Sequence, residues 1–495
     1  MSLLGIDIGT TGCKAGVFSD CGQCLCTAYR EYSTLYPQSG YAELDSINVW
    51  LQVKEAIQEA VSGAKEDPVS TLCVSSLGEA AVPVSAGRDI LGSSILCSDI
   101  RGGEYIASLL ERIGREPMYR INPNIPGPNY TLPKILWIKE NQPDLYEKAD
   151  TFLLWDGLTG FLLGCDPYIS FSHANRTLLF DINLEDWSED IIHASGMDRE
   201  KLPPCVREGT VVGTVSKSAA EELGLSAGVK VVAGGHDQCL NALGAGITQP
   251  GHAVDGIGTF ECITPIYDTI PDSSSMLENG LNIEHYVLPG MYVSFIYNQA
   301  GSLVRWFRDT FAQEIKDRDD VYDVLNAEMP EAPTDLFVLP YFEPSGSPGF
   351  VADASGVITG LKTSTSRGEI LKAVMESITY YFAESLETLR QMNIDTSEFT
   401  ATGGGARSDR WLQIKADIFG RPFVRPDITE AGLAGAAILA GVSAGVFSTP
   451  EEGTECFVQR GDVFEPDSGR HAEYRGRLQK YKELLPLMRD YLRRL

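Results

Sequence analysis

The chain lacks the two glycine-rich fingerprints by which many nucleotide-binding enzymes are identified. Its 495 residues contain neither GxxxxGK(S/T) nor GxGxxG, so a P-loop enzyme and a dinucleotide-binding fold both lose their usual sequence support. Histidine is scarce as well: there are 6, and they stand apart from one another. Cys21, Cys24 and Cys26 lie together, but no second group of ligands accompanies them. Because a structural zinc site needs such a second group, we interpret these cysteines as small residues of a hairpin.

Basic residues are few, and no long hydrophobic run is present. There are 40 Lys and Arg against 68 Asp and Glu, a formal net charge of -28, and such a field repels nucleic acid and anionic membranes. The longest uncharged apolar stretch, residues 431–447, is mostly Gly and Ala and is shorter than the ~20 residues of a membrane span. We expect it to form a buried helix whose small residues let backbones approach closely. No secretory signal is recognisable, and the 11 cysteines form no disulfide-like pattern. We therefore expect a cytoplasmic protein that binds neither nucleic acid nor membranes.

The sequence does hold alternating strand and helix signals over a length suited to two domains. A chain of 495 residues with 43% hydrophobic content is too long for one core. It opens with a strand-like run, LLGIDIG, a Gly/Thr turn and a second run, KAGVFSD, and residues 251–267 repeat that arrangement. Amphipathic helices are expected at 369–392 and 409–419. The fold class is therefore α/β.

The second hairpin also indicates where the chain divides. We place the boundary near Ala245 to Gln249, just before that hairpin begins. The predicted domains are residues 1–246 and residues 247–495.

Three Gly-rich turns follow strand-like runs. They are Gly9-Thr10-Thr11-Gly12, Gly256-Ile257-Gly258-Thr259 and Gly403-Gly404-Gly405. Glycines let backbone N–H groups converge on phosphate oxygens, and threonine hydroxyls add donors. Any one of these turns alone is more often a plain hairpin turn. Their distribution over both halves of the chain favours phosphate binding.

Two aspartates stand beside these turns. Asp7 lies in an apolar strand, where a carboxylate is costly unless it has a partner; that partner is either its own turn or hydrated Mg²⁺ beside a phosphate. Asp237 follows Gly-Gly-His and precedes a helix. It is either an N-cap or a general base, and one side chain can serve as both.

In this order the motifs resemble those of the FGGY carbohydrate kinases, which act on glycerol, xylulose, gluconate, fuculose and related compounds. LGIDIGTTGCKAGVF resembles their first phosphate hairpin, GGHDQ their Gly-x-Asp catalytic motif and GIGTFE their second phosphate loop. The segment from Gly356 to Glu376 fits their C-terminal signature, and ATGGGARS resembles their nucleotide motif. The resemblance covers nearly the whole chain. It implies two ribonuclease-H-like (actin-like ATPase) domains with an interdomain cleft, sugar on the N-terminal domain and ATP on the C-terminal domain.

The resemblance also implies a role for each motif residue. Asp237 would be the general base for the attacking hydroxyl, and Asp7 would hold Mg²⁺. ATP would be bound by Thr10, Thr11, Lys14, Gly258, Thr259, Gly404, Gly405 and Ser408. A small sugar or polyol would be bound by Glu79, Asp99, Arg101, Asp237 and Gln238. The implied reaction is ATP-dependent phosphorylation of one hydroxyl of that acceptor.

Several of these residues have plainer interpretations, and the sequence departs from the family in places. Lys14 reads equally as a solvated strand residue, Glu79 as a surface carboxylate, and Asp99 with Arg101 as an ion pair at a helix start. The Glu-Arg pair of the family's L-P-Y-x-x-G-E-R segment is missing. SLGE, residues 76–79, replaces the Gln-Met-His-Gly of xylulose kinases. We therefore expect D-xylulose to be a poor substrate.

Two other functions compete with a kinase. An actin-like or chaperone-like ATPase would use nucleotide as a conformational switch, but it has no need of Asp237 together with Glu79, Asp99 and Arg101. A sugar-binding regulator without activity would have no need of an intact set of Asp7, Thr10, Thr259 and Asp237. The sequence leaves the identity of the sugar open, and likewise the oligomeric state, a homodimer included.

Overall fold

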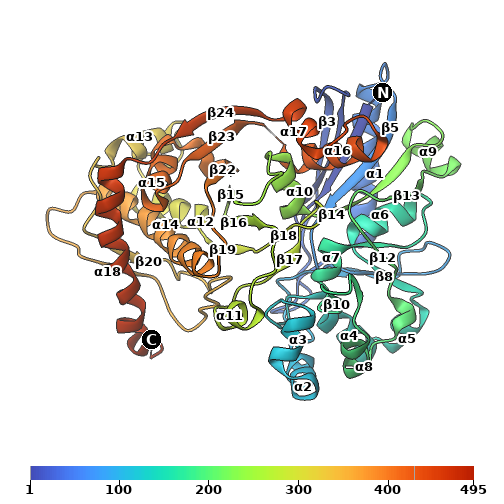
Figure 1. Ribbon diagram of the computed structural model, residues 1–495, viewed down its shortest axis with the longest axis horizontal. Coiled ribbons are helices and arrows are strands. Elements are labelled where there is room, and N and C mark those ends of the chain that lie inside the picture. The colour runs from blue at the N-terminus through green and yellow to red at the C-terminus, as the bar shows by residue number, and fades with distance from the viewer. Residues whose placement is uncertain (1, 429, 495) are drawn as a thin grey trace. The chain divides into compact units, whose positions relative to one another are not determined.

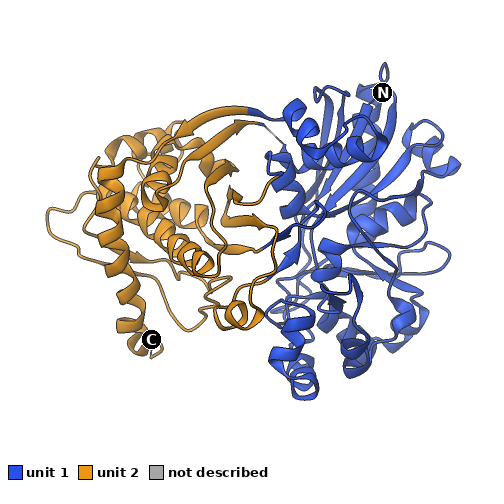
Figure 2. Cartoon of the chain, viewed as in Figure 1, with its two compact units in different colours: residues 1–248, 283–293, 428–459 blue, residues 249–282, 294–427, 460–495 orange. Residues whose placement is uncertain are grey.

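The computed structural model describes residues 2–428 and 430–494. The chain forms two compact units, coloured separately in Figure 2: unit 1 comprises residues 1–248, 283–293 and 428–459, and unit 2 the remainder. The first division falls between residues 248 and 249, beside the predicted boundary. The prediction divided the chain into two continuous blocks. It did not include the assignment of two later segments, residues 283–293 and 428–459, to unit 1.

The second of these segments belongs to unit 1 because it contains helix α16 (Ala431–Ala444). This helix is hydrophobic all round and packs against β1, β5 and α10 of unit 1. Its small residues allow backbones to approach closely. A Cβ placed on Gly435 would lie 1.9 Å from the Leu240 carbonyl oxygen. Helix α16 therefore completes the core of unit 1, although most of unit 2 precedes it in sequence.

Unit 1 is built on a six-stranded sheet in the order β13-β14-β5-β1-β2-β3, of which β3, β5, β13 and β14 are labelled in Figure 1. The strands are β1 (Ser2–Ile8), β2 (Gly12–Phe18), β3 (Cys24–Glu31), β5 (Val69–Ser76), β13 (Val211–Thr214) and β14 (Lys230–His236). β1, β2 and β3 form an antiparallel meander, whereas β1, β5 and β14 run parallel. In the register, Asp7 pairs with Ser75 and Ser76 pairs with His236. The carboxyl ends of three parallel strands therefore meet at one edge, where ligands of α/β sheets bind.

Helices cover this sheet and form the lobe beside it. The helices of unit 1 besides α16 are α1 (Ser46–Gly63), α2 (Gly103–Ile113), α3 (Arg115–Ile121), α4 (Thr131–Asn141), α5 (Pro143–Lys148), α6 (Trp155–Leu163), α7 (Phe171–Asn175), α8 (Glu189–Ser195), α9 (Lys217–Leu223), α10 (Asp237–Gly244) and α17 (Pro450–Phe457). Helix α10 begins directly where β14 ends. That junction sets Asp237 at the carboxyl edge of the sheet.

Unit 2 repeats the plan of a hairpin followed by parallel strands. Its central strands are β15 (His252–Ile257), β16 (Phe260–Tyr267), β19 (Ile296–Gln299), β22 (Glu398–Thr402) and β23 (Phe423–Asp427). β15 and β16 are antiparallel, and β15, β22 and β23 are parallel. The helices are α11 (Ser273–Glu278), α12 (Gly301–Phe311), α13 (Val321–Glu328), α14 (Arg367–Gln391), α15 (Asp409–Phe419) and α18 (Ser468–Leu492). The structure confirms the helices predicted at 369–392 and 409–419.

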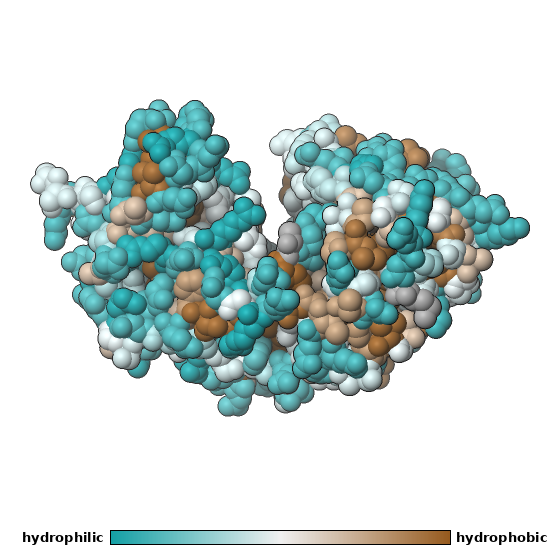
Figure 3. All heavy atoms as spheres, turned by 90° about the horizontal axis from the view of Figure 1, so that it is seen from above, coloured by the Kyte–Doolittle hydropathy of each residue, from teal (hydrophilic) through white to brown (hydrophobic). Residues whose placement is uncertain are grey.

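The surface agrees with the acidic, polar composition. Hydrophilic residues cover most of the face drawn in Figure 3. Within residues 2–428 and 430–494, no helix combines the length and the apolar character that crossing a bilayer requires.

Candidate active site

Asp7 stands near the end of β1, at the carboxyl edge of the unit 1 sheet. Its Oδ1 accepts a hydrogen bond of 2.7 Å from the Ser75 hydroxyl. A Cβ placed on Gly432 of α16 would lie 3.2 Å from Asp7 Oδ2, so α16 walls the carboxylate on one side. Burial raises the pKa of Asp7, against the hydrogen bond from Ser75 and the charge of Lys14, which lower it. Its partner is thus a residue of the neighbouring strand rather than its own turn.

The first hairpin turn presents its threonines to solvent. Thr10 and Thr11 are exposed at the turn between β1 and β2. Lys14 pairs with Asp7 in the register of that hairpin, and its Nζ lies 2.6 Å from Glu430 Oε2. Lys14 is thus a partly exposed lysine paired with Glu430, and its contact with a phosphate stays a prediction.

Asp237 is the first residue of α10, and His236 occupies the N-cap position without a side-chain cap bond. The N-cap interpretation of Asp237 is therefore wrong by one residue, because β14 extends to His236. Burial raises the pKa of Asp237 to about 7, the charges of Asp7 and Glu79 add to this effect, and His173 opposes it. The side chain is 31% exposed. A carboxyl group poised near neutral pH at a sheet edge suits a general base. Gln238 follows it in the first turn, partly exposed.

Glu79 is buried and paired, not a solvated surface carboxylate. It is 4% exposed and adopts a positive φ of 63°. Its Oε1 accepts hydrogen bonds from Nε of Arg176, at 2.6 Å, and from Nη2 of the same guanidinium. Arg176 Nη1 donates to Glu284 Oε1 at 2.7 Å. Contact of Glu79 with acceptor hydroxyls remains a prediction.

Asp99 and Arg101 form the core of a buried ion cluster. Arg101 Nε donates to Asp99 Oδ2 at 2.9 Å, and Arg101 Nη2 donates to Glu43 at 2.8 Å. Burial raises the pKa of Asp99, but the hydrogen bonds from Arg101 outweigh it and hold that pKa below its ordinary value. Lys134 donates to the Asp99 carbonyl oxygen, and burial lowers its pKa to about 8. The geometry gives Asp99 and Arg101 a scaffold role, and their contact with a sugar stays a prediction.

In unit 2, a cavity of about 630 Å³ opens beside the second hairpin. All five residues predicted there line it: Gly258, Thr259, Gly404, Gly405 and Ser408. The Ser408 hydroxyl also caps α15 by accepting from the Trp411 N–H at 3.2 Å. The cavity thus lies at the start of a helix, which is favourable for anionic groups.

Sequence reasoning missed two arginines of this cavity. Arg305 and Arg407 both line it, and Arg305 Nη2 lies 3.4 Å from Thr259 Oγ1. Arg407 lies within the ATGGGARS motif, so the sequence could have indicated that it lines the cavity. Arg305 is on α12, and nothing in its local sequence marks it as a neighbour of Thr259.

A buried ion cluster ties the second hairpin to α15. Lys415 Nζ lies 2.9 Å from Asp255 Oδ2 and 2.5 Å from Glu261 Oε1, and all three side chains are fully buried. Burial and the charge of Asp255 raise the pKa of Glu261, and Lys415 opposes both effects. Asp255 and Glu261 flank the Gly258-Thr259 turn, whereas Lys415 comes from the helix that begins at the cavity. The cluster therefore holds two walls of the cavity together.

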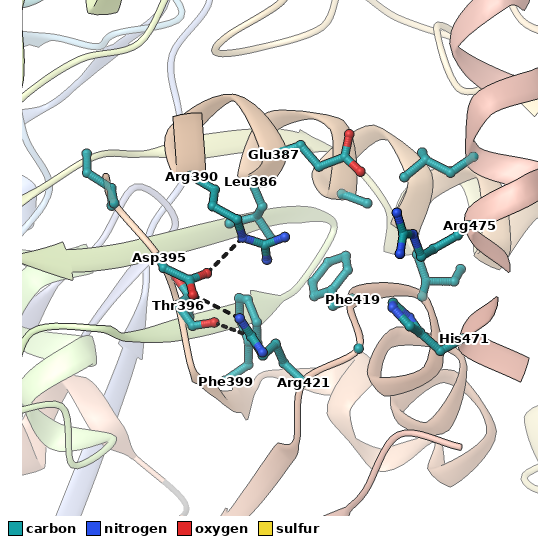
Figure 4. A pocket seen from close by; sticks show the side chains of 15 residues that line it. Leu386, Glu387, Arg390, Asp395, Thr396, Phe399, Phe419, Arg421, His471 and Arg475 are labelled. Atoms are coloured by element: carbon teal, nitrogen blue, oxygen red, sulfur yellow. Dashed lines mark hydrogen bonds and ion pairs between the residues drawn. The ribbon is translucent and has the colours of Figure 1, made fainter. Parts of the chain in front are cut away.

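A second pocket in unit 2, of about 230 Å³, is distinct from this cavity (Figure 4). Arg390 and Arg421 converge there on Asp395, at 2.9 and 2.8 Å. The pocket is lined by the last residues of α15 and the first of β22, whereas the cavity adjoins the opposite ends of both elements. Two of the arginines that line it, Arg390 and Arg421, share the single carboxylate of Asp395, and none of the residues predicted to bind ATP lines this pocket.

Known proteins resemble this chain in sequence and in fold. The profile described as the FGGY family of carbohydrate kinases, N-terminal domain, matches residues 2–244, and its C-terminal-domain counterpart matches residues 280–444. The xylulose kinase of Bacillus subtilis is 28% identical over 490 residues, covering 99% of this chain and 97% of its own. The glycerol kinase of Koribacter versatilis is 28% identical and covers 94% of each chain. The crystal structure of xylulose kinase from Rhodospirillum rubrum superposes with a TM-score of 0.91 at 25% identity, covering 99% of this chain and 100% of that one. This likeness confirms the predicted α/β fold of two ribonuclease-H-like domains.

Proposed function

Because the chain belongs to the FGGY family of carbohydrate kinases, we propose that it transfers the terminal phosphoryl group of ATP to a hydroxyl of a small sugar or polyol, with Asp237 as general base. The observation that most directly supports this proposal is the position of Asp237 at the carboxyl edge of the sheet, where its pKa is raised to about 7. When ionised it accepts the proton of the attacking hydroxyl, so the oxygen attacks as negative charge develops on it. We place the reaction in the cytoplasm, as expected from the cysteine pattern.

The phosphates would be held by the glycine-rich turns. Thr10 and Thr11 offer hydroxyl and N–H donors from the first hairpin, and Gly258 and Thr259 do so from the second. Gly404, Gly405 and Ser408 would border the nucleotide at the start of α15, where the helix dipole favours anions. Transfer of a phosphoryl group depends mainly on such positioning and charge neutralisation. ATP would thus lie mainly on unit 2 and the acceptor on unit 1.

Asp7 is the residue suited to a magnesium ion. Hydrated Mg²⁺ is commonly held by one or two carboxylates together with substrate phosphates. Asp7 fits this pattern, because it is a single partly exposed carboxylate next to the first phosphate turn. Within the part of the chain that the structure describes, no group of three or more His, Cys, Asp or Glu could form a metal cage. The ion, when bound, would supply charge neutralisation to the phosphates.

An acceptor panel tests the proposed function. We expect ADP release from ATP that depends on a sugar or polyol, with D-xylulose a poor acceptor because SLGE replaces the xylulose kinase motif. ATP turnover that is the same with and without every acceptor would favour the nucleotide-switch function instead. D-xylulose as the best acceptor would contradict the substrate prediction alone.

Replacing Thr259 by valine tests the second phosphate turn. The exposed hydroxyl should contact the transferring group more strongly in the transition state than in bound ATP. We expect kcat to fall by about ten- to a hundredfold while calorimetry shows nearly unchanged affinities for ATP and acceptor. Thr269→Val, at an exposed position outside the cavity, is the control. Equal losses in rate and ATP affinity would contradict a transition-state role.

Replacing Glu79 by alanine tests the acceptor site. Loss of one charge-assisted hydrogen bond should raise the KM of the best acceptor at least about 10-fold, while the KM for ATP hardly moves. Glu79→Gln keeps an oxygen for Arg176 but lacks the charge, so it separates substrate contact from support of Arg176. Glu66→Ala, at an exposed position of unit 1, is the surface control. An unchanged acceptor KM in Glu79→Ala would remove Glu79 from the site.

A further inference from the structure

Helix α7 carries a histidine whose two ring nitrogens are both occupied. His173 Nδ1 lies 3.0 Å from Asp156 Oδ1 and 3.1 Å from the Ser170 hydroxyl. Its Nε2 lies 3.2 Å from the Ser76 carbonyl oxygen and 3.3 Å from the Ser76 hydroxyl. All four side chains have no exposed surface. A serine, a histidine and an aspartate thus stand in the order of a hydrolase triad.

Burial excludes a nucleophilic role for this serine. A nucleophile must meet its substrate, whereas the Ser76 side chain is fully covered. Its hydroxyl is also directed to the Leu77 carbonyl oxygen, at 3.4 Å. The contacts among Ser76, His173 and Asp156 can therefore influence other groups of the protein, but they cannot attack a substrate.

The contacts of the ring are met in two protonation states. With an N–H on both nitrogens, His173 donates to the Ser76 carbonyl oxygen and to Asp156 at the same time; with an N–H on Nδ1 alone, it donates to Asp156 and accepts from the Ser76 hydroxyl. The Ser170 hydroxyl donates to Asp156 Oδ2 at 2.8 Å, which leaves its oxygen as a further acceptor for Nδ1. The imidazolium is the form that bonds the Ser76 carbonyl oxygen and Asp156 together. Consistently, its pKa lies above the ordinary value, because Asp156 outweighs the effect of burial, which lowers it.

The ring of His173 lies against the ring of His236, the residue that precedes Asp237 in the chain. The rings of His173 and His236 meet edge to face with centroids 6.1 Å apart, and His236 Nε2 lies 3.5 Å from Asp237 Oδ1. Nε2 of His173 contacts Ser76, which pairs with His236 in the sheet. Asp156 binds the opposite nitrogen. The ion pair is thus a dipole whose positive end points toward the Asp237 end of β14.

We propose that His173, held as an imidazolium by Asp156, is a positioning residue that favours the ionised form of Asp237 for proton abstraction. This inference rests on the proposed function of Asp237. Two carboxylates, Asp7 and Glu79, disfavour ionisation of the base, and His173 counteracts them.

The other charged groups around the ring are accounted for. Asp156 on α6 and Asp237 on α10 raise the pKa of His173. Burial raises the pKa of Glu208, before β13, to about 7, against the hydrogen bonds from Ser172 and the charge of His173, which lower it. His236 on β14 stays neutral, since burial, Arg176 and His173 all lower its pKa.

The pH dependence of kcat tests the proposal. His173→Gln removes the charge, and Asp156→Asn removes the carboxylate that maintains it. Both should move the acidic limb of the kcat profile by about half to one unit toward higher pH, with kcat at high pH within about threefold of the wild type. His193→Gln makes the same chemical change at an exposed position of α8 and should move nothing. A uniform loss of rate with an unmoved limb would show a merely structural role and overturn the proposal.

NMR of the imidazole groups provides a readout that needs no activity. The ¹⁵N and ¹³C shifts assigned to His173 should report a charged ring at pH 7 in the wild type and a neutral one in Asp156→Asn. A neutral ring in the folded wild type would refute the proposal even if neither variant folds. Absence of acceptor-dependent phosphorylation in the wild type would instead refute the proposed kinase reaction, and the imidazole signal separates the two failures.

Discussion

Replacement of Asp237 by asparagine should lower kcat by about 10²–10⁴-fold while ATP binding stays nearly unchanged. Asparagine keeps the size and polarity of the first residue of α10 but cannot take up the proton of the acceptor hydroxyl. The helix start should survive, because the N-cap position belongs to His236. Steady-state kinetics with the best acceptor, and calorimetry with ATP, measure the two quantities.

The pH profile sharpens this expectation. Since the pKa of Asp237 is raised to about 7, the base is half protonated near neutral pH, and wild-type kcat should rise with pH through that range. The residual rate of Asp237→Asn should lack this limb. Asp166→Asn, at an exposed position of unit 1, should behave as the wild type. Near-wild-type turnover in folded Asp237→Asn would contradict the role of Asp237 as general base.

Replacement of Lys415 by methionine should destabilise unit 2 by about 3–5 kcal/mol. Lys415 is the only cation placed between Asp255 and Glu261 among the described contacts, and all three side chains are fully buried. Methionine matches the length of the lysine stem but leaves two carboxylates without compensation. Hydrogen exchange should therefore accelerate by on the order of a hundredfold to a thousandfold in β15 and α15.

Internal and external controls separate this effect from general damage. Exchange in β1 and β5 of unit 1 should stay unchanged, and Lys316→Met, at an exposed position, should alter neither unit. Adding Glu261→Gln to Lys415→Met should recover part of the loss, because one buried charge is then removed. Unchanged exchange in β15 and α15 of Lys415→Met would show that the cluster does not stabilise the hairpin.

The elements of the candidate site were predictable where their signals are local. Glycine turns and apolar alternation mark the hairpins around Thr10 and Thr259 within a few residues. Helical periodicity placed α15 at 409–419, as observed. These signals are local because turn chemistry and side-chain periodicity are set by neighbouring residues. The turn residues of the candidate cavity could therefore be named from the sequence.

Burial, pairing and charge were decided only by the tertiary structure. Arg176 reaches Glu79 across 97 positions and Glu284 across 108, and Lys415 reaches Glu261 across 154. No local pattern encodes such partners, because they depend on which strands become neighbours in the sheet.

The assignment of α16 shows the same division between sequence and structure. The sequence by itself determined that residues 431–447 would be a buried helix allowing close backbone contact, because the segment's own small and uncharged residues indicate this. It did not determine which sheet the helix would cover. The tertiary structure packs it against β1 and β5 of unit 1, because its small residues fit the backbones of that unit. The same folding makes Asp7, Asp237 and His173 neighbours, and their pKa values follow from burial and mutual charge rather than from residue type.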